Sequence, residues 1–165
     1  MADFTSVYLR CVYKTSMKDS LVQVKIQGIL PAPGGSGVFL AAEKKVITIF
    51  IDSMVTRALQ LAVKKENAPR PLTHDLFSSA LAGLGVKIVR VIIHDFSEET
   101  YYARLHLEQK NELGQSHLEV DARPSDCLVL ALQNNAPVFI SRKVWEEAED
   151  MSWAMDQLSP GDNEA

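Results

Sequence analysis

Two short polar motifs carry the side chains in this sequence that could do chemistry. They lie at residues 70–75 and 121–126, and the candidates are Arg70, His74, Asp75, Asp121, Arg123, Ser125 and Asp126. Hydrolysis of a phosphodiester needs an activated water, neutralisation of the phosphate charge and protonation of the leaving group. Carboxylates with a divalent cation, or histidine with arginine, supply these functions. The residue types in the two motifs permit such a site, although they do not by themselves identify the substrate.

The chemical type of each candidate residue suggests either a catalytic or a substrate-binding role. The predicted catalytic residues are His74, Asp75, Asp121 and Asp126, and the predicted substrate-binding residues are Arg70, Arg123 and Ser125. The carboxylates are compatible with a divalent cation, Mg²⁺ or Mn²⁺, but no spacing identifies the metal ligands. We expect the two motif turns to meet in space, because they occupy different halves of one small domain.

A purely structural interpretation of the same residues stays open. Asp75 and Asp126 would lie in the first turns of helices, where carboxylates complement the helix dipole. Thr73 is a suitable N-cap for the first of these helices. Arg70 and Arg123 could pair with the two carboxylates and lock the halves of the chain together.

A strand and a helix must position the second motif. Residues 116–121 alternate between apolar and polar side chains, as in a half-buried strand, and residues 124–134 are predicted to form the helix. Pro124 suits the first turn of a helix. Cys127 to Leu132 are all apolar, so this helix should be buried on every side.

The remaining pattern predicts an α+β fold of two similar halves. Each half contains three strands followed by two helices, at about residues 20–85 and 86–150. We expect these duplicated β3-α2 repeats to form one strongly curved, barrel-like sheet with the helices packed outside. Residues 1–155 would form a single domain, and residues 156–165 an acidic disordered tail. The glycine-rich stretch 31–37 lacks the Lys-Ser/Thr of a phosphate-binding loop, which favours a mobile hairpin loop.

Charge is distributed unevenly along the 165 residues. The net charge is −4, but residues 146–165 hold seven acids and no Lys or Arg, so the rest holds 17 basic and 14 acidic residues. A basic body permits nucleic acid binding. No secretory signal or apolar run of membrane-spanning length is present, and two cysteines make no disulfide framework. We expect a cytoplasmic protein without membrane partners. Zinc, nucleophile-elbow and Walker motifs are also absent from the sequence.

Both motifs resemble the bifunctional nuclease domain family. The segments that carry the resemblance are 70–76, 101–105, 121–126 and 137–140, and it extends over roughly residues 20–148. The resemblance implies a duplicated three-strand, two-helix fold, dimer formation and, from plant members, nuclease activity on DNA and RNA. Residues 51–56 depart from the family pattern, which usually has a Gly and a Glu-Ala pair there, and Cys127 replaces the usual Ala.

The leading functional hypothesis is a weak, non-specific nuclease that hydrolyses DNA and RNA, and it rests on the resemblance. The alternative is a non-enzymatic, dimeric ligand-binding or regulatory module. An open cluster of His74, Asp75, Arg123 and Asp126 would favour the enzyme, whereas full mutual pairing would favour the module.

Overall fold

The structure is a computed structural model that describes residues 9–10, 20–112 and 114–156. The strands are β1 (Leu9–Arg10), β2 (Leu21–Ala32), β3 (Gly35–Ala42), β4 (Lys45–Asp52), β5 (Val86–Ser97), β6 (Thr100–Asn111), β7 (Gly114–Ala122) and β8 (Val138–Ser141). The helices are α1 (Ser53–Lys64), α2 (Thr73–Gly83), α3 (Pro124–Gln133), α4 (Arg142–Glu147) and α5 (Ser152–Asp156). The described chain is therefore a mixed α+β protein, as predicted. Residues 157–165 of the predicted tail lie outside the described part.

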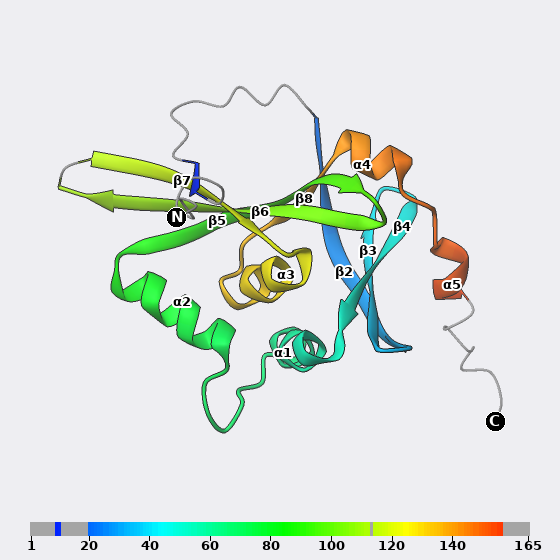
Figure 1. Cartoon of the computed structure of the whole chain (residues 1–165), viewed down its shortest axis with the longest axis horizontal. Coiled ribbons are helices and arrows are strands. Elements are labelled where there is room, and N and C mark those ends of the chain that lie inside the picture. The colour runs from blue at the N-terminus through cyan, green and yellow to red at the C-terminus, as the bar shows by residue number, and fades with distance from the viewer. Residues whose placement is uncertain (1–8, 11–19, 113, 157–165) are drawn as a thin grey trace, which may run out of the picture.

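Two antiparallel meanders, β2–β3–β4 and β5–β6–β7, make up most of the sheet (Figure 1). The strand order is β1-β7-β6-β5-β8-β2-β3-β4. β8 lies between the meanders, parallel to β5 and antiparallel to β2. A parallel pair needs a long crossover, which here runs through β6, β7 and α3.

The predicted barrel-like curvature is wrong. The sheet is open, since β1 and β4 end the strand order in the described residues and do not pair with each other. The prediction rested on strands that are consecutive and hairpin-connected, which were expected to form one strongly curved sheet with every helix outside it. Instead, α3 fills the space beside both meanders. The duplication is not confirmed either, because β8 follows α3 whereas no strand lies between α1 and α2 among the described residues.

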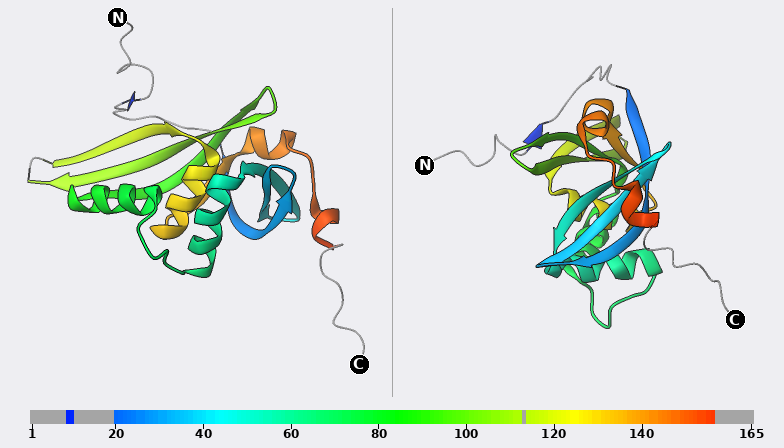
Figure 2. Two further views of the ribbon diagram at one scale, coloured as in Figure 1. Left: turned by 60° about the horizontal axis from the view of Figure 1, so that its bottom comes forward. Right: turned by 90° about the vertical axis from the view of Figure 1, so that its right-hand side faces the viewer.

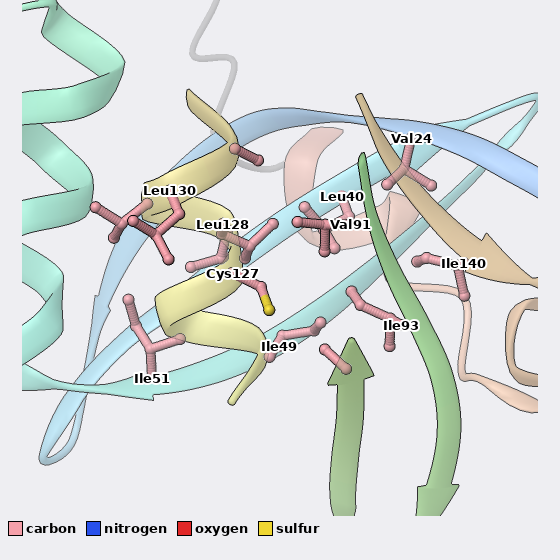
Figure 3. Packing of buried hydrophobic residues seen from close by; sticks show 14 of the residues in the cluster. Val24, Leu40, Ile49, Ile51, Val91, Ile93, Cys127, Leu128, Leu130 and Ile140 are labelled. Atoms are coloured by element: carbon pink, nitrogen blue, oxygen red, sulfur yellow. The ribbon is translucent and has the colours of Figure 1, made fainter. Parts of the chain in front are cut away.

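Helix α3 is the centre of the hydrophobic core. Residues Cys127 to Ala131 are all buried, as the apolar run predicted. Figure 3 shows α3 side chains lying against strands of both meanders, among them Ile49 of β4 and Val91 of β5. The expectation that the helices pack outside is therefore wrong for α3. A helix without a polar face has no side that it can turn to water.

Helices α1 and α2 lie beside α3 on the same side of the sheet (Figure 2). Helix α1 buries Val55, Ala58 and Leu59, whereas α2 has no buried residue. α2 nevertheless follows a tight N-terminal turn that fixes its start next to the start of α3. The sheet and α3 thus position the two motifs.

The glycine-rich stretch is a tight turn rather than a mobile loop. β2 continues to Ala32 and pairs there with Gly35, so only Pro33 and Gly34 turn the chain. Gly34 has a φ of 78°, a conformation that glycine adopts without strain. A Cβ on Gly35 would collide with the carbonyl oxygen of Ile51. The close approach of β3 to β4 therefore explains why residue 35 is a glycine.

Candidate active site

The two motif turns meet at the N-termini of α2 and α3. His74 Nε2 lies 2.9 Å from Asp126 Oδ1, although the residues are 52 positions apart in the sequence. An ionised carboxylate can only accept hydrogen bonds, so Nε2 carries the hydrogen and Nδ1 is the acceptor of the neutral ring. Nδ1 has no hydrogen-bond partner among the described residues. It is the atom that can take a proton from water.

Arg123 binds the other side of the same carboxylate. Its Nε and Nη2 donate to Asp126 Oδ2 and Oδ1 at 2.8 and 3.2 Å, which is a bidentate pair. Its Nη1 donates to Asp52 Oδ2 at 3.2 Å. A continuous chain therefore runs from His74 through Asp126 and Arg123 to Asp52, and we call these four residues the polar chain.

Asp52 is the member that the sequence interpretation missed. It ends β4 and caps α1, where its Oδ1 accepts from the backbone N–H groups of Met54 and Val55. Its other carboxylate oxygen remains for Arg123. The available signal was its position between a strand and a helix, which Asp121 nearly shares. Because capping alone explains an aspartate at that position, its second role as a partner of Arg123 was overlooked.

Burial and charge tune the polar chain. The side chains of His74 and Asp126 are 14% and 28% exposed, whereas that of Arg123 is 61% exposed. Burial raises the pKa of Asp126, but the hydrogen bonds from Arg123 and His74 outweigh it and hold the pKa below its ordinary value. The pKa of Arg123 is raised, chiefly by its hydrogen bonds with Asp126. Both groups are therefore charged at neutral pH.

The polar chain lies in a groove of about 750 Å³, which we call the motif groove. Apolar side chains from α1, α3, the sheet and the start of α2 supply most of the remaining lining, among them Met54, Val55, Ala58, Leu72, Phe77, Leu105, Val120 and Leu130. A groove of this size can admit a ligand to the polar chain. The apolar lining was not predicted from the motifs.

Asp75 is adjacent to His74 in sequence but performs a structural task. Its Oδ2 accepts from Leu72 N at 2.7 Å, and its Oδ1 accepts from Gln133 Nε2 at 2.7 Å. The first bond fixes the start of α2 and the second ties α2 to the end of α3. Leu72, and not the expected Thr73, is the N-cap residue.

The other three predicted residues lie away from the motif groove. Asp121 and Ser125 line a second groove, whose lining includes Arg123 but not His74. Ser125 is buried and Asp121 is exposed. Arg70 is exposed and makes no hydrogen bond or ion pair within the described ranges. The structure thus brings together His74, Arg123 and Asp126 but not the full predicted set.

The described residues do not fit a preformed divalent-cation site. They contain no group of three or more His, Cys, Asp or Glu side chains placed to hold a metal ion. Both carboxylate oxygens of Asp126 already accept bonds from His74 and Arg123. We therefore derive no step through Mg²⁺ or Mn²⁺.

A comparison with protein families decides the classification. The model of the bifunctional nuclease domain matches residues 38–152, which is well over half of the chain. The chain belongs to the bifunctional nuclease domain family. The matched range includes every member of the polar chain, so the resemblance of the two motifs is confirmed.

Relatives of this bifunctional nuclease domain protein occur in Mycobacterium tuberculosis. Two proteins described as uncharacterized, from two strains, are each 32% identical over 130 residues, covering 76% of this chain and 75% of theirs. Their descriptions name no substrate. No helix in the described part of the chain is long and apolar enough to cross a membrane.

Proposed function

We propose that this protein is a weak, non-specific nuclease that hydrolyses phosphodiester bonds in DNA and RNA. The observation that carries the proposal is the His74–Asp126 pair, held beside an exposed arginine in the motif groove of a bifunctional nuclease domain. A base oriented by a carboxylate and placed next to a phosphate-binding cation is the arrangement that phosphodiester hydrolysis needs.

Each member of the polar chain has a role in the proposed reaction. His74 Nδ1 takes a proton from the attacking water, while Asp126 orients the ring and stabilises its cationic form. The water oxygen bonds to phosphorus as the bond to the departing nucleotide oxygen breaks, and that oxygen takes its proton from solvent water. Arg123 has five N–H donors, of which three bind Asp52 and Asp126, so two remain for a phosphate oxygen. Asp52 keeps the guanidinium group turned toward the groove.

The remaining predicted residues take different parts in the proposal. Asp75 positions His74 by fixing the first turn of α2, since its two oxygens bind Leu72 and Gln133. Arg70 is free to contact nucleic acid backbone beyond the groove. Asp121 and Ser125 line the second groove and not the motif groove, so they take no direct part in the proposed reaction.

The test is nicking of supercoiled plasmid and degradation of RNA by purified protein. We expect His74→Ala to lower the rate by about 100-fold or more, the usual effect of removing a general base. His117→Ala is the matched control, because His117 is an exposed histidine on β7 outside the motif groove. Equal loss in both variants, or no loss in either, would contradict the assignment of the base.

Parallel reactions with EDTA, Mg²⁺ and Mn²⁺ test the metal separately. The proposed histidine–arginine chemistry predicts activity that survives EDTA. Complete dependence on an added cation would contradict the proposed histidine–arginine chemistry.

One observation favours the alternative, a non-enzymatic binding or regulatory module. Every carboxylate of the polar chain is paired, and the groove around it is mainly apolar. Fully paired ions are also what a structural lock between helices would show. If freshly purified protein binds nucleic acid in a fluorescence anisotropy assay but does not cleave it, the result would favour this module over the nuclease.

We also propose that the protein forms a homodimer through α2. Leu76 and Phe77 of α2, and Leu84 directly after it, are 66%, 40% and 67% exposed, and no residue of the helix is buried. Exposed apolar side chains grouped in this way are typical of a protein contact. Light scattering should show a dimer that Leu76→Glu dissociates. The control Gln60→Glu, at an exposed position of α1, should leave the dimer intact.

A further inference from the structure

Strand β4 is the last strand of the sheet and has one free edge. Its first residues on that edge are covered by the chain that follows α4. Met151 N donates to Val46 O at 2.7 Å, and Val46 N donates to Asp150 Oδ1 at 3.3 Å. Val46 therefore turns its backbone N–H and C=O away from β3 and toward the edge.

Thr48 and Phe50 must turn their backbone groups to the same edge. In an antiparallel pair, successive residues direct their N–H and C=O groups to opposite sides, so every second residue faces the edge. These two residues make no edge hydrogen bond within the described ranges. The side chain of Phe50 is also 73% exposed. An unpaired strand edge of this kind is a template for another strand.

A groove adjoins the Phe50 end of this unpaired edge. It has a volume of about 420 Å³, and we call it the edge groove. Three runs of consecutive residues line it: 49–52 of β4, 99–102 of the β5–β6 hairpin and 121–125 from the end of β7 to the start of α3. Phe50 belongs to this lining, whereas Thr48, two residues earlier on the same edge, lies outside it. An extended chain that lies in the groove beside Phe50 and continues along the edge of β4 would reach the free groups of both residues.

The charges in the edge groove favour a partner with basic side chains. Asp52, Glu99 and Asp121 line it with one base, Arg123, which is already paired with Asp52 and Asp126. This excess of carboxylates repels a phosphate backbone and attracts a cationic side chain. Residues 157–165 of the chain itself carry two acids and no base, which is the wrong charge for this groove.

We propose that the edge groove binds an extended peptide of a partner protein that carries basic side chains. The peptide adds a strand to β4 through the backbone groups of Thr48 and Phe50, and its basic side chains approach Glu99 and Asp121. Addition of a strand to an exposed sheet edge is an established mode of peptide recognition. This surface is distinct from the motif groove, although Arg123 and Asp52 belong to both linings.

The test uses a fluorescein-labelled hexapeptide of alternating lysine and valine with the full-length protein. Fluorescence anisotropy should show binding, and a glutamate–valine peptide of the same length should not bind. A lysine–valine peptide with N-methylated valines should bind more weakly, because it lacks backbone donors. Hydrogen exchange at the amides of Thr48 and Phe50 should slow when the lysine peptide is added.

Two variants of Phe50 distinguish the contribution of its backbone N–H to peptide binding from that of its side chain. Phe50→Pro removes an edge N–H without breaking the bonds to β3, and Phe50→Ala keeps that N–H. We expect the proline variant to bind about fivefold or more weakly than the alanine variant, the usual effect of one lost hydrogen bond. Glu99→Gln should also weaken binding, and circular dichroism checks that each variant folds.

Several results would overturn the proposal. They are equal binding of the acidic peptide, equal affinity of the Phe50→Pro and Phe50→Ala variants, and no binding of any peptide. Self-association that Phe50→Pro abolishes would show a second copy as the occupant. Competition by a labelled oligothymidine would show nucleic acid there. Because these readouts measure binding alone, they are independent of whether the protein cleaves nucleic acid.

Discussion

His74 and Asp126 join the starts of two helices through one 2.9 Å contact between Nε2 and Oδ1. α3 is held rigidly by the core, so Asp126 is the fixed partner of the pair. α2 has no buried residue, so His74 lies on the more loosely held helix. The contact therefore both anchors α2 and orients the imidazole. Variants of this pair must be tested for stability as well as for activity.

Replacement of Arg123 should affect nucleic acid cleavage more than folding. Arg123→Lys keeps the charge but cannot bind Asp126 with two parallel bonds and Asp52 with a third. We expect cleavage to fall by about tenfold or more, while the loss of stability stays near 1 kcal/mol, because the side chain is largely exposed. Plasmid nicking and urea unfolding measure the two effects. A loss of stability without a loss of cleavage would identify a structural lock.

Asp75→Asn should show the opposite pattern. The change leaves one side-chain oxygen and weakens the bonds to Leu72 and Gln133, which fix the start of α2 and its contact with α3. We expect a destabilisation of about 1–2 kcal/mol in urea unfolding. Cleavage by the folded fraction should persist, since Asp75 does not line the motif groove. If a fully folded Asp75→Asn variant did not cleave nucleic acid, Asp75 would be a catalytic residue, as the sequence predicted.

Acid should weaken the polar chain through Asp126. The pKa of this carboxyl group is held below its ordinary value of 3.8 in the folded protein. Its contribution to stability is therefore fully present above the unfolded pKa and is lost as the pH falls through the folded pKa. Unfolding in urea at pH 7 and pH 3 should show a smaller acid loss for Asp126→Asn than for wild type. Asp121→Asn, which leaves the ion pairs of Asp126 with His74 and Arg123 intact, is the matched control.

His106 should make stability depend on pH in a higher range. Burial lowers its pKa from 6.5 to about 4, partly opposed by Glu119 and assisted by Arg90, Arg104 and His94. The unfolded chain then binds a proton that the folded chain does not, so stability falls as the pH drops from 6.5 to 4. The loss should reach about 3.5 kcal/mol at most, since one pKa unit corresponds to about 1.4 kcal/mol. Urea unfolding of His106→Gln should lack this slope, whereas the exposed His117→Gln should retain it.

The two glycines of the β2–β3 turn should respond differently to alanine. Gly34→Ala places a Cβ in open space at a φ of 78° and should cost about 1 kcal/mol. Gly35→Ala drives its Cβ into the Ile51 carbonyl oxygen and should cost more, about 3 kcal/mol, because backbone must move. Thermal unfolding of both variants measures the difference. Equal losses would show that β4 can shift away from β3.

The sequence predicted the local elements of this fold better than their assembly. The apolar run from Cys127 to Leu132 correctly indicated a buried helix, and alternation correctly indicated a strand in residues 116–121. The barrel was wrong because local patterns carry no information on what fills the space between two meanders. The position of β8 also depends on long-range pairing, which no short pattern in residues 137–140 reveals.

The candidate site was predicted in part for a similar reason. His74, Arg123 and Asp126 were named from their motifs, and their meeting required only that two helix starts lie together. Asp52 was missed because its capping of α1 is a sufficient local explanation. Asp75 was assigned to catalysis because a sequence cannot show that both of its oxygens bind other groups.

The insertion of β8 between the meanders has a consequence for the order in which the chain can fold. No strand of β2–β3–β4 pairs with a strand of β5–β6–β7 in the described sheet, so residues 138–141 supply the only hydrogen-bonded seam between them. During synthesis both meanders emerge before that seam does. The N-terminal edge of β2 and the edge of β5 must therefore wait unpaired on the ribosome, and they are the surfaces that a nascent chain has to protect from aggregation.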